Sequence, residues 1–248
     1  METQAGSTTT LSGKRIVLLG GTSGIGFATA EMAAREGAVL VVASSRRESV
    51  DRAVARLPKG TEGYVLDLSN EEQVRDFFNR IGTFDHLAFT AGEALQVGEL
   101  SKINVEQARC FFDLRFWGAF MAAKYGSSHI RSGGSIVLSS GMAGRRPPDK
   151  GWTLVASVIG AAEALARALA VELAPIRVNA VCPGLVKTEL WRNLMEEDRE
   201  AMYQGSGQTL LVGRVGEAQD VAQAYLYLMR EGYSTGQVIV VDGGSALV

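Results

Sequence analysis

The stretch Arg15-Ile-Val-Leu-Leu-Gly-Gly-Thr-Ser-Gly-Ile-Gly-Phe27 joins a short apolar run to a glycine-rich turn. Residues 16–19 predict a strand that is buried on both faces. Gly20, Gly24 and Gly26 follow at once, and residues 28–34 supply strong helix formers. Glycines let the backbone approach phosphate groups closely, and a helix N-terminus offers free N–H groups and a positive dipole end. The order strand, turn, helix therefore predicts a pyrophosphate site rather than a plain tight turn.

Composition sets the broad class of the protein. The chain has 248 residues, 46% of them hydrophobic, and a net charge of −2. This length and composition predict one α/β domain over residues 1–248 with a sizeable core. No basic run is longer than a pair, such as Arg46-Arg47 or Arg145-Arg146, which argues against nucleic acid or an anionic membrane as a partner. Two distant cysteines in apolar surroundings predict free thiols, with neither a disulfide nor a metal site.

The N-terminal segment and the hydropathy of the chain bear on location. Residues 1–12 are polar and rich in threonine, without the apolar core of a signal peptide, and are predicted to be flexible. We identify no apolar run long enough to cross a bilayer. The sequence therefore predicts a soluble, cytoplasmic protein.

The end of the second predicted strand, residues 39–43, bears on which dinucleotide binds. An acidic side chain there would bond the ribose hydroxyls and repel a 2′-phosphate. The sequence instead places Ser44, Ser45, Arg46 and Arg47 at this point. Hydroxyl donors and cations favour NADP(H) over NAD(H). The alternative, that both arginines only face solvent, stays open.

Strands and helices alternate along the rest of the chain. This rhythm predicts a Rossmann-type, doubly wound parallel sheet of about seven strands with helices on both faces and ligands at the strand C-termini. Asp67, after the third strand, is expected either to bond an adenine amino group or to cap the next helix. The further predicted elements are strands at 63–66, 86–90, 134–140, 177–181 and 238–241, a long helix at 105–129, and a substrate lid at 189–210.

Seven landmarks occur in an order that resembles the short-chain dehydrogenase/reductase family. They are Gly20–Gly26, Asp67-Leu68, Ala91-Gly92, Gly134–Ser140, Ile176–Asn179, Pro183-Gly184 with Thr188, and Thr235-Gly236 with Asp242–Gly244. The resemblance implies a nicotinamide cofactor, and homodimers or homotetramers packed through the long helices. The cofactor residues that it implies are Gly20, Thr22, Ser23, Gly24, Ile25, Gly26, Ser44, Ser45, Arg46, Asp67, Leu68, Ala91, Gly92, Pro183, Gly184, Val186 and Thr188.

The family's catalytic residues carry over only in part. Ser140 matches the serine that polarises the substrate carbonyl. Counted from Ala156-Ser157, the family's proton-donating tyrosine falls at Leu154 and its lysine at Val158. Arg115 stands where the family has an asparagine that holds a proton-relay water. The usual carbonyl chemistry should therefore be poor, because general acid catalysis contributes roughly 10²–10⁴-fold.

An iminium substrate would avoid the missing proton relay, because hydride addition turns it directly into a neutral amine. Asp149 is the predicted carboxylate that would stabilise such a cation. Arg115 is expected to pair with Asp149 or with a substrate group, and Trp152 to line the substrate pocket with Leu154 and Val158. Three alternatives stay open: Arg115 could face solvent or a partner subunit, Asp149 could be a turn residue, and Trp152 an interface anchor.

Three functions follow from these residues. The favoured one is an NADP(H)-dependent oxidoreductase that transfers hydride to an imine, an iminium or a similarly activated small molecule. Fungal indole-alkaloid reductases of the same family look similar at the altered positions; they reduce a cationic diene precursor and then guide a cycloaddition. The alternatives are a carbonyl reductase with a substitute acid, such as Asp149, Lys150 or a water held by Ser140, and a non-catalytic NADP(H)-binding homologue.

Overall fold

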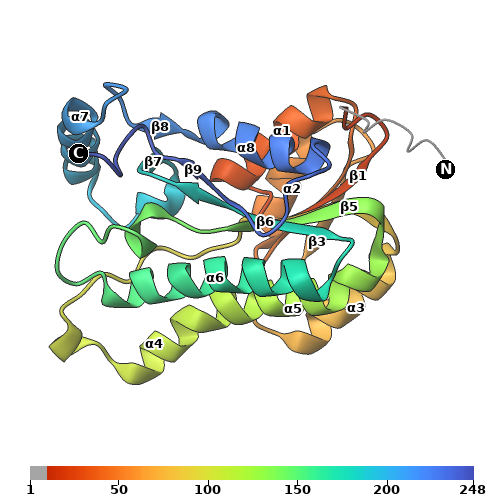
Figure 1. Cartoon of the computed structure of the whole chain (residues 1–248), viewed down its shortest axis with the longest axis horizontal. Coiled ribbons are helices and arrows are strands. Elements are labelled where there is room, and N and C mark those ends of the chain that lie inside the picture. Colours follow the sequence, from red (N-terminus) through yellow and green to blue (C-terminus); the bar gives the residue numbers. More distant parts are fainter. Residues whose placement is uncertain (1–9) are drawn as a thin grey trace.

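A seven-stranded parallel sheet forms the centre of the protein, whose computed structural model describes residues 10–248 (Figure 1). Its strand order is β3-β2-β1-β4-β5-β6-β9, and every neighbouring pair is parallel. This confirms the predicted doubly wound sheet. The strands are β1 (Arg15–Leu19), β2 (Val39–Ser44), β3 (Glu62–Val65), β4 (Phe84–Phe89), β5 (Ile130–Ser139), β6 (Arg177–Pro183) and β9 (Val238–Val241).

Helices cover both faces of the sheet (Figure 1). One face carries α1 (Gly24–Arg35), α2 (Arg47–Arg56) and α8 (Ala218–Arg230). The other face carries α3 (Glu71–Ile81), α5 (Ala119–Gly126) and α6 (Thr153–Glu172). The strand order reverses between β1 and β4, so their carboxyl ends open the crevice where ligands bind in such folds.

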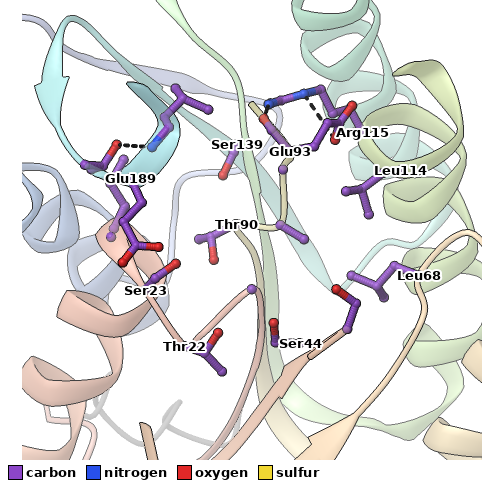
Figure 2. A pocket seen from close by; sticks show the side chains of 18 of the residues that line it. Thr22, Ser23, Ser44, Leu68, Thr90, Glu93, Leu114, Arg115, Ser139 and Glu189 are labelled. Carbon is purple, nitrogen blue, oxygen red and sulfur yellow. Dashed lines mark hydrogen bonds and ion pairs between the residues drawn. The ribbon is translucent and has the colours of Figure 1, made fainter. Parts of the chain in front are cut away.

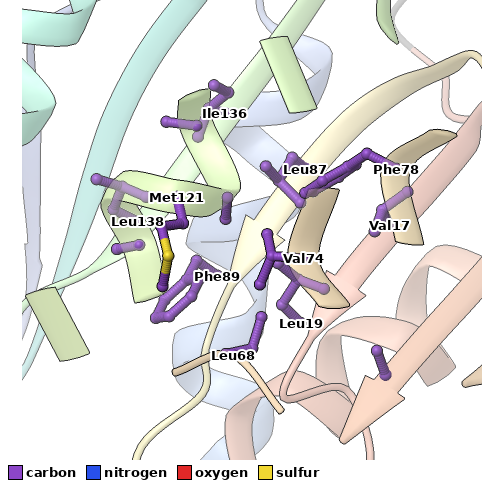
Figure 3. Packing of buried hydrophobic residues seen from close by; sticks show 14 of the residues in the cluster. Val17, Leu19, Leu68, Val74, Phe78, Leu87, Phe89, Met121, Ile136 and Leu138 are labelled. Atoms are coloured by element: carbon purple, nitrogen blue, oxygen red, sulfur yellow. The ribbon is translucent and has the colours of Figure 1, made fainter. Parts of the chain in front are cut away.

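Alternation along the buried strands builds a core on each face. Val17 and Leu19 of β1 point into the cluster under α3, α5 and α6, where Phe78 and Leu87 are also fully buried (Figure 3). Ile16 and Leu18 of the same strand point into the opposite cluster. Successive strand residues face opposite sides, which explains why the whole run is apolar.

The helix predicted at 105–129 is interrupted. It consists of α4 (Val105–Phe112), a π-helical segment η2 (Asp113–Gly118), α5 and a 3-10 turn η3 (Ser127–His129). A π turn inserts one extra residue and so rotates the side chains on either side of it relative to each other, often at functional sites. The predicted helical stretch is confirmed over 105–129, but it is not a regular α-helix at Arg115 and its neighbours.

The segment predicted as a lid lies between two short paired strands. β7 (Val186–Lys187) pairs in parallel with β8 (Gly216–Glu217). Between them lie η5 (Glu189–Trp191) and α7 (Glu196–Thr209). Its movement as a lid stays a prediction. Two further 3-10 turns are η1 (Leu100–Lys102) and η4 (Met142–Gly144).

Two expectations from the ends and hydropathy of the chain need correction. Residues 1–9 of the predicted flexible segment lie outside the described part, but Leu11 within it is fully buried in the core. One helix, α6, is long and apolar enough to cross a membrane by length and composition alone. This is weak evidence for a span, since α6 packs one face on the sheet as a core helix does.

Candidate active site

A groove of about 740 Å³ lies across the carboxyl ends of β1, β2 and β4. It runs from the glycine turn after β1 towards the end of β5 (Figure 2). Most of the predicted cofactor residues line it. They are Gly20, Thr22, Ser23, Gly24, Ile25, Ser44, Ser45, Arg46, Asp67, Leu68, Ala91, Gly92, Pro183 and Thr188.

The start of α1 fits a pyrophosphate group. Ser23, its N-cap residue, makes no side-chain capping hydrogen bond, and no acidic residue lies in the first turn. The free N–H groups of this helix end therefore stay available to an anion. Gly26 is needed because a Cβ there would collide with the main-chain oxygen of Gly20 and with Thr90 Oγ1. The turn thereby packs directly against the end of β4.

Three predicted cofactor residues do not line this groove. Gly26 supports the turn from behind, and Gly184 lines a neighbouring cavity instead. Val186 is 6% exposed and packs in the core beneath α1 and α8. Its carbonyl oxygen accepts a hydrogen bond from Trp191 Nε1 at 3.1 Å. Contact of the main-chain groups of these three residues with the cofactor stays a prediction.

The two arginines at the β2 end of the groove differ in whether they have an ionic partner. Arg46 lines the groove and has no ionic partner among the described residues, whereas Arg47 approaches Asp51 at 3.7 Å. Asp67 also lines the groove, and its Oδ1 accepts hydrogen bonds from the main-chain and side-chain groups of Ser69. Asn70 caps α3, so the capping alternative for Asp67 was wrong.

A second cavity, of about 520 Å³, adjoins the groove and is mainly apolar. Trp152 and Trp191 contribute neighbouring rings, tilted by 52° with centroids 6.5 Å apart. The two cavities share Ala91, Arg115, Ser139, Ser140, Pro183 and Leu190. The cavity also contains Leu95, Met142, Pro147, Pro148, Leu185 and Met202. This arrangement fits a hydrophobic ligand next to the β5 end of the groove.

Helix α6 presents only apolar side chains to this cavity. Val155, Val158, Ile159 and Ala162 line it, as predicted for Val158. Leu154 does not; it packs on the cluster around Phe111. One residue along a helix rotates the side chain by about 100°, so Val155 faces the cavity instead. Among the described residues that line the two cavities, none is a tyrosine, lysine or histidine.

Arg115 points inward from the π-helical segment and pairs with Glu93 rather than Asp149 (Figure 2). Arg115 Nε lies 3.7 Å from Glu93 Oε2, and its guanidinium donates to the Glu93 main-chain oxygen. It also lies 5.1 Å above the Phe111 ring. A Cβ at Gly92 would come within 2.8 Å of the guanidinium, so glycine there makes the approach possible.

The Glu93–Arg115 pair is poorly satisfied. Both Glu93 carboxylate oxygens and Arg115 Nε are inaccessible to solvent and have no hydrogen-bond partner within the described structure. Burial raises the pKa of Glu93, while the charge of Arg115 acts in the opposite direction. Burial has the opposite effect on the basic partner and lowers the pKa of Arg115, because it disfavours the charged form of each group. Buried polar atoms without partners are costly, which makes this pair a candidate to contact a ligand.

The predicted carboxylate, Asp149, does not line either cavity. It is exposed, and its Oδ1 accepts a hydrogen bond from the Lys150 N–H, as in the turn alternative. The prolines before it and Trp152 after it do line the second cavity. A catalytic role for Asp149 stays a prediction, which this placement does not support.

Ser140 lies at the junction of groove and cavity, as predicted. Its hydroxyl donates to Glu163 Oε1 at 2.8 Å, and Arg145 Nε donates to the same oxygen at 3.1 Å. The neighbouring Ser139 is held by the Phe89 main-chain oxygen and the Tyr225 hydroxyl at 2.7 and 2.6 Å. Both serines line the groove and the cavity, and Ser140 is the one at the position predicted from the sequence.

Comparison with known proteins identifies the family. A family model described as enoyl-(acyl carrier protein) reductase matches residues 20–246. A short-chain dehydrogenase/reductase of Acremonium sp, ucsE, is 37% identical, over 96% of this chain and 97% of its own. The chain belongs to the short-chain dehydrogenase/reductase family. It is an oxidoreductase of this family, as its relatives are.

Two solved structures of the family are especially similar to this chain. A small-chain dehydrogenase in complex with NADPH is 43% identical, with a TM-score of 0.85 over 96% of this chain and 100% of the other. The MalC reductase/Diels-Alderase of Malbranchea aurantiaca is 30% identical, with a TM-score of 0.90 over 98% and 100% of the two chains.

Sequence reasoning missed Glu93 and Glu163 in this family member. Glu93 directly follows the Ala91-Gly92 landmark, a position that could have marked it as close to the ligand. Glu163 lies 8% exposed on α6, and a charged residue on the buried face of an apolar helix was an available indication. Within residues 10–248, no cluster of three metal-binding side chains occurs.

Proposed function

We propose that the protein is an NADP(H)-dependent reductase that transfers hydride to a hydrophobic cyclic imine or iminium. The observation that carries this proposal is the apolar cavity beside the groove, whose described lining includes no tyrosine, lysine or histidine. The family's catalytic tyrosine and lysine would thus be missing whether their positions are Leu154 and Val158 or Val155 and Ile159.

The cofactor assignment is supported by the groove and by a relative. Thr22, Ser23 and the open end of α1 suit the pyrophosphate, and Arg46 suits a 2′-phosphate at the ribose end. The 43% identical structure was solved in complex with NADPH. Bound NADPH would supply the hydride. Preference for NADP(H) over NAD(H) is part of the proposal.

The side chains of α6 decide which electrophile can react. Val155, Val158 and Ile159 give the cavity an apolar wall and offer no proton. A ketone that accepts hydride becomes an alkoxide and needs a proton as it forms, so it loses roughly 10²–10⁴-fold without a general acid. An iminium that accepts hydride becomes a neutral amine and needs none. The cavity therefore favours an iminium.

The Glu93–Arg115 pair makes a cationic substrate acceptable. The charge of Arg115 alone would repel a cation in this weakly solvated site. Glu93, 3.7 Å away, offsets that charge and leaves carboxylate oxygens without hydrogen bonds. Glu93 thus replaces Asp149 as the proposed carboxylate that stabilises the cation.

A structural relative supports reduction of an unusual substrate. The MalC structure, with a TM-score of 0.90, is described as a reductase and Diels-Alderase, which joins reduction to a cycloaddition. A curated relative, malC of the same fungus, is 32% identical over 96% of this chain. We propose the same broad class of chemistry here, reduction of an activated, unsaturated small molecule.

Carbonyl reduction is a second candidate function, because one buried group could act as an acid. Burial raises the pKa of Glu93, which increases the fraction that carries a proton near neutral pH. Protonated Glu93 could donate to a substrate oxygen if that oxygen lay beside Gly92. The two candidates therefore require opposite protonation states of the same carboxyl group.

NADPH oxidation with matched substrates tests the proposal. N-methyl-3,4-dihydroisoquinolinium is a permanent cation, 3,4-dihydroisoquinoline is its titratable relative, and 1-tetralone is a ketone of similar shape. We expect turnover of both nitrogen compounds and turnover of the ketone lower by about a hundredfold or more. Equal rates with 1-tetralone would favour carbonyl reduction. Binding of NADPH without oxidation by any of them would refute reduction of this substrate class.

Assembly and location stay proposals. Trp117 and Phe120 on the π segment and α5 are 50% and 37% exposed, with ring centroids 5.8 Å apart. Such exposed aromatic groups are frequent at protein interfaces. We propose a homodimer or homotetramer packed through these helices, in the cytoplasm, to be checked by light scattering of wild type and Trp117→Glu.

A further inference from the structure

Glu163 is a charged residue on an apolar helix, and its surroundings tie it to Ser140. It is 8% exposed on α6, and its Oε1 accepts from both Ser140 and Arg145. Its Oε2 lies 3.4 Å from an Arg145 nitrogen and 3.9 Å from one of Arg167. Two guanidinium groups therefore hold the carboxylate behind Ser140.

The proton count at Ser140 follows from this arrangement. A hydroxyl has one proton to donate and two lone pairs that accept, whereas a carboxylate only accepts. Since Ser140 and Glu163 are 2.8 Å apart, the Ser140 proton lies between them. The Ser140 oxygen at the junction of groove and cavity is left with its lone pairs. It can accept a hydrogen bond from a ligand, but it has no second proton for a carbonyl oxygen.

Cys182 is the other group near this hydroxyl; burial outweighs a hydrogen bond from Ser140 and the charge of Arg145, which act to lower its pKa. Burial raises the pKa of Cys182 to about 11, and the charge of Glu163 acts in the same direction. The thiol therefore keeps its proton at neutral pH and donates towards Met142 Sδ at 3.6 Å. Glu163 is left as the acceptor for Ser140.

We propose that Glu163 is a positioning residue, which fixes the Ser140 hydroxyl as an acceptor and makes the site select ligands with an N–H donor over ligands with a carbonyl or ether oxygen. This rests on the proposed function, because the selected N–H belongs to an iminium substrate or its amine product. Ser140 in this protein would thus act in the opposite sense to the carbonyl-polarising serine of the family.

Equilibrium binding separates this role from catalysis. Calorimetry of the full chain saturated with NADP⁺ compares 1,2,3,4-tetrahydroisoquinolinium with isochroman, in which an ether oxygen replaces the N–H group. We expect wild type to bind the amine at least tenfold more tightly, since hydrogen bonds to charged groups contribute about 1.5–3 kcal/mol. In Glu163→Gln the amide can donate to Ser140, so this preference should fall about tenfold. Glu172→Gln, the same change at an exposed position of α6, should keep it.

Ser140→Ala distinguishes a hydrogen bond from a general effect of charge. It removes the accepting oxygen but keeps the Glu163 carboxylate, and we expect the same loss of preference. A preference lost in Glu163→Gln but kept in Ser140→Ala would overturn the positioning role, as would a wild-type chain without preference or without binding of the amine. If Glu163→Gln does not bind NADP⁺, the test rests on Ser140→Ala, and an unchanged preference for the amine in that variant would overturn the proposal.

The two proposals can fail independently. Loss of the amine preference in both variants, without NADPH oxidation by any iminium in wild type, would reject the reaction and keep the positioning role. Turnover of iminium compounds, with a preference that neither variant changes, would reject only the role of Glu163.

Discussion

Two glutamate–arginine pairs adjoin the site, and they differ in how well their polar atoms are satisfied. In the first, Glu93 and Arg115 lie 3.7 Å apart and leave both carboxylate oxygens without a hydrogen bond. In the second, Glu163 accepts hydrogen bonds from Ser140 and Arg145. An unsatisfied buried pair gains from any ligand that completes it, whereas a satisfied pair mainly fixes geometry. The first pair therefore suits ligand binding, and the second suits orientation of a neighbour.

The same substitution at both arginines gives the largest expected contrast. Breaking a fully buried pair costs about 3–5 kcal/mol. Because the Arg115 and Glu93 side chains are 19% and 31% exposed, we expect Arg115→Gln to lower the free energy of unfolding by about 2–3 kcal/mol. Arg145→Gln should cost less than about 1 kcal/mol, since Arg145 is 40% exposed and Arg167 remains near Glu163. Urea denaturation measures both; equal losses would contradict the contrast.

The protonation state of Glu93 gives the next largest effect and sharpens the role of the first pair. Burial raises its pKa. If the ionised form offsets Arg115, reduction of N-methyl-3,4-dihydroisoquinolinium is fast above this raised pKa and slows as the pH falls through it. If protonated Glu93 acts as an acid, ketone reduction is fast below the pKa and slows as the pH rises. Glu93→Gln should abolish whichever of these two pH dependences is observed. A pH–rate profile of wild type and variant measures it.

A charge at the other end of the crevice provides a smaller effect. Arg46 lines the groove without an ionic partner among the described residues. Loss of a partly exposed contact to a 2′-phosphate should raise the KM for NADPH about tenfold in Arg46→Ala, with little change for NADH. Arg47→Ala is the matched control, because Arg47 is near Asp51 and does not line the groove. An equal loss for NADH would argue against recognition of the phosphate.

The smallest expected effect concerns the thiols. Burial and the charge of Glu163 raise the pKa of Cys182 to about 11, while Cys110 is exposed in the cofactor groove. Iodoacetamide at neutral pH should therefore modify Cys110 and leave Cys182 intact, since the thiolate is the reactive form. Mass spectrometry of the two peptides checks this, and equal labelling of Cys182 would show that it is accessible.

The dinucleotide end of the crevice was largely predictable because its contacts are made by backbone in a fixed local order. A strand, a glycine turn and a helix occur within residues 15–35, so their spacing alone places Gly20 and Ser23. The sequence did not show that the Val186 side chain is buried in the core next to the β7–β8 pairing; contact of its main chain with the cofactor stays a prediction.

The substrate end could not be predicted to the same depth, because its side chains come from distant segments. Glu93 and Arg115 are 22 positions apart in the sequence, and the direction of Arg115 depends on the π turn that carries it. On α6 an error of one residue exchanged Leu154 for Val155. The pairing of Ser140 with Glu163 depends on how α6 lies against β5, which no local pattern specifies.

The β7–β8 ladder has a consequence for how this protein family can diversify. It fastens the two ends of the intervening segment side by side, through Val186 with Gly216 and Lys187 with Glu217. The segment between them is a closed loop anchored to the sheet, and added length in such a loop costs little conformational entropy. The sequence and length of this segment can therefore change, placing different side chains over the cavity. The seven-stranded sheet and the groove across its strand ends need not change with it.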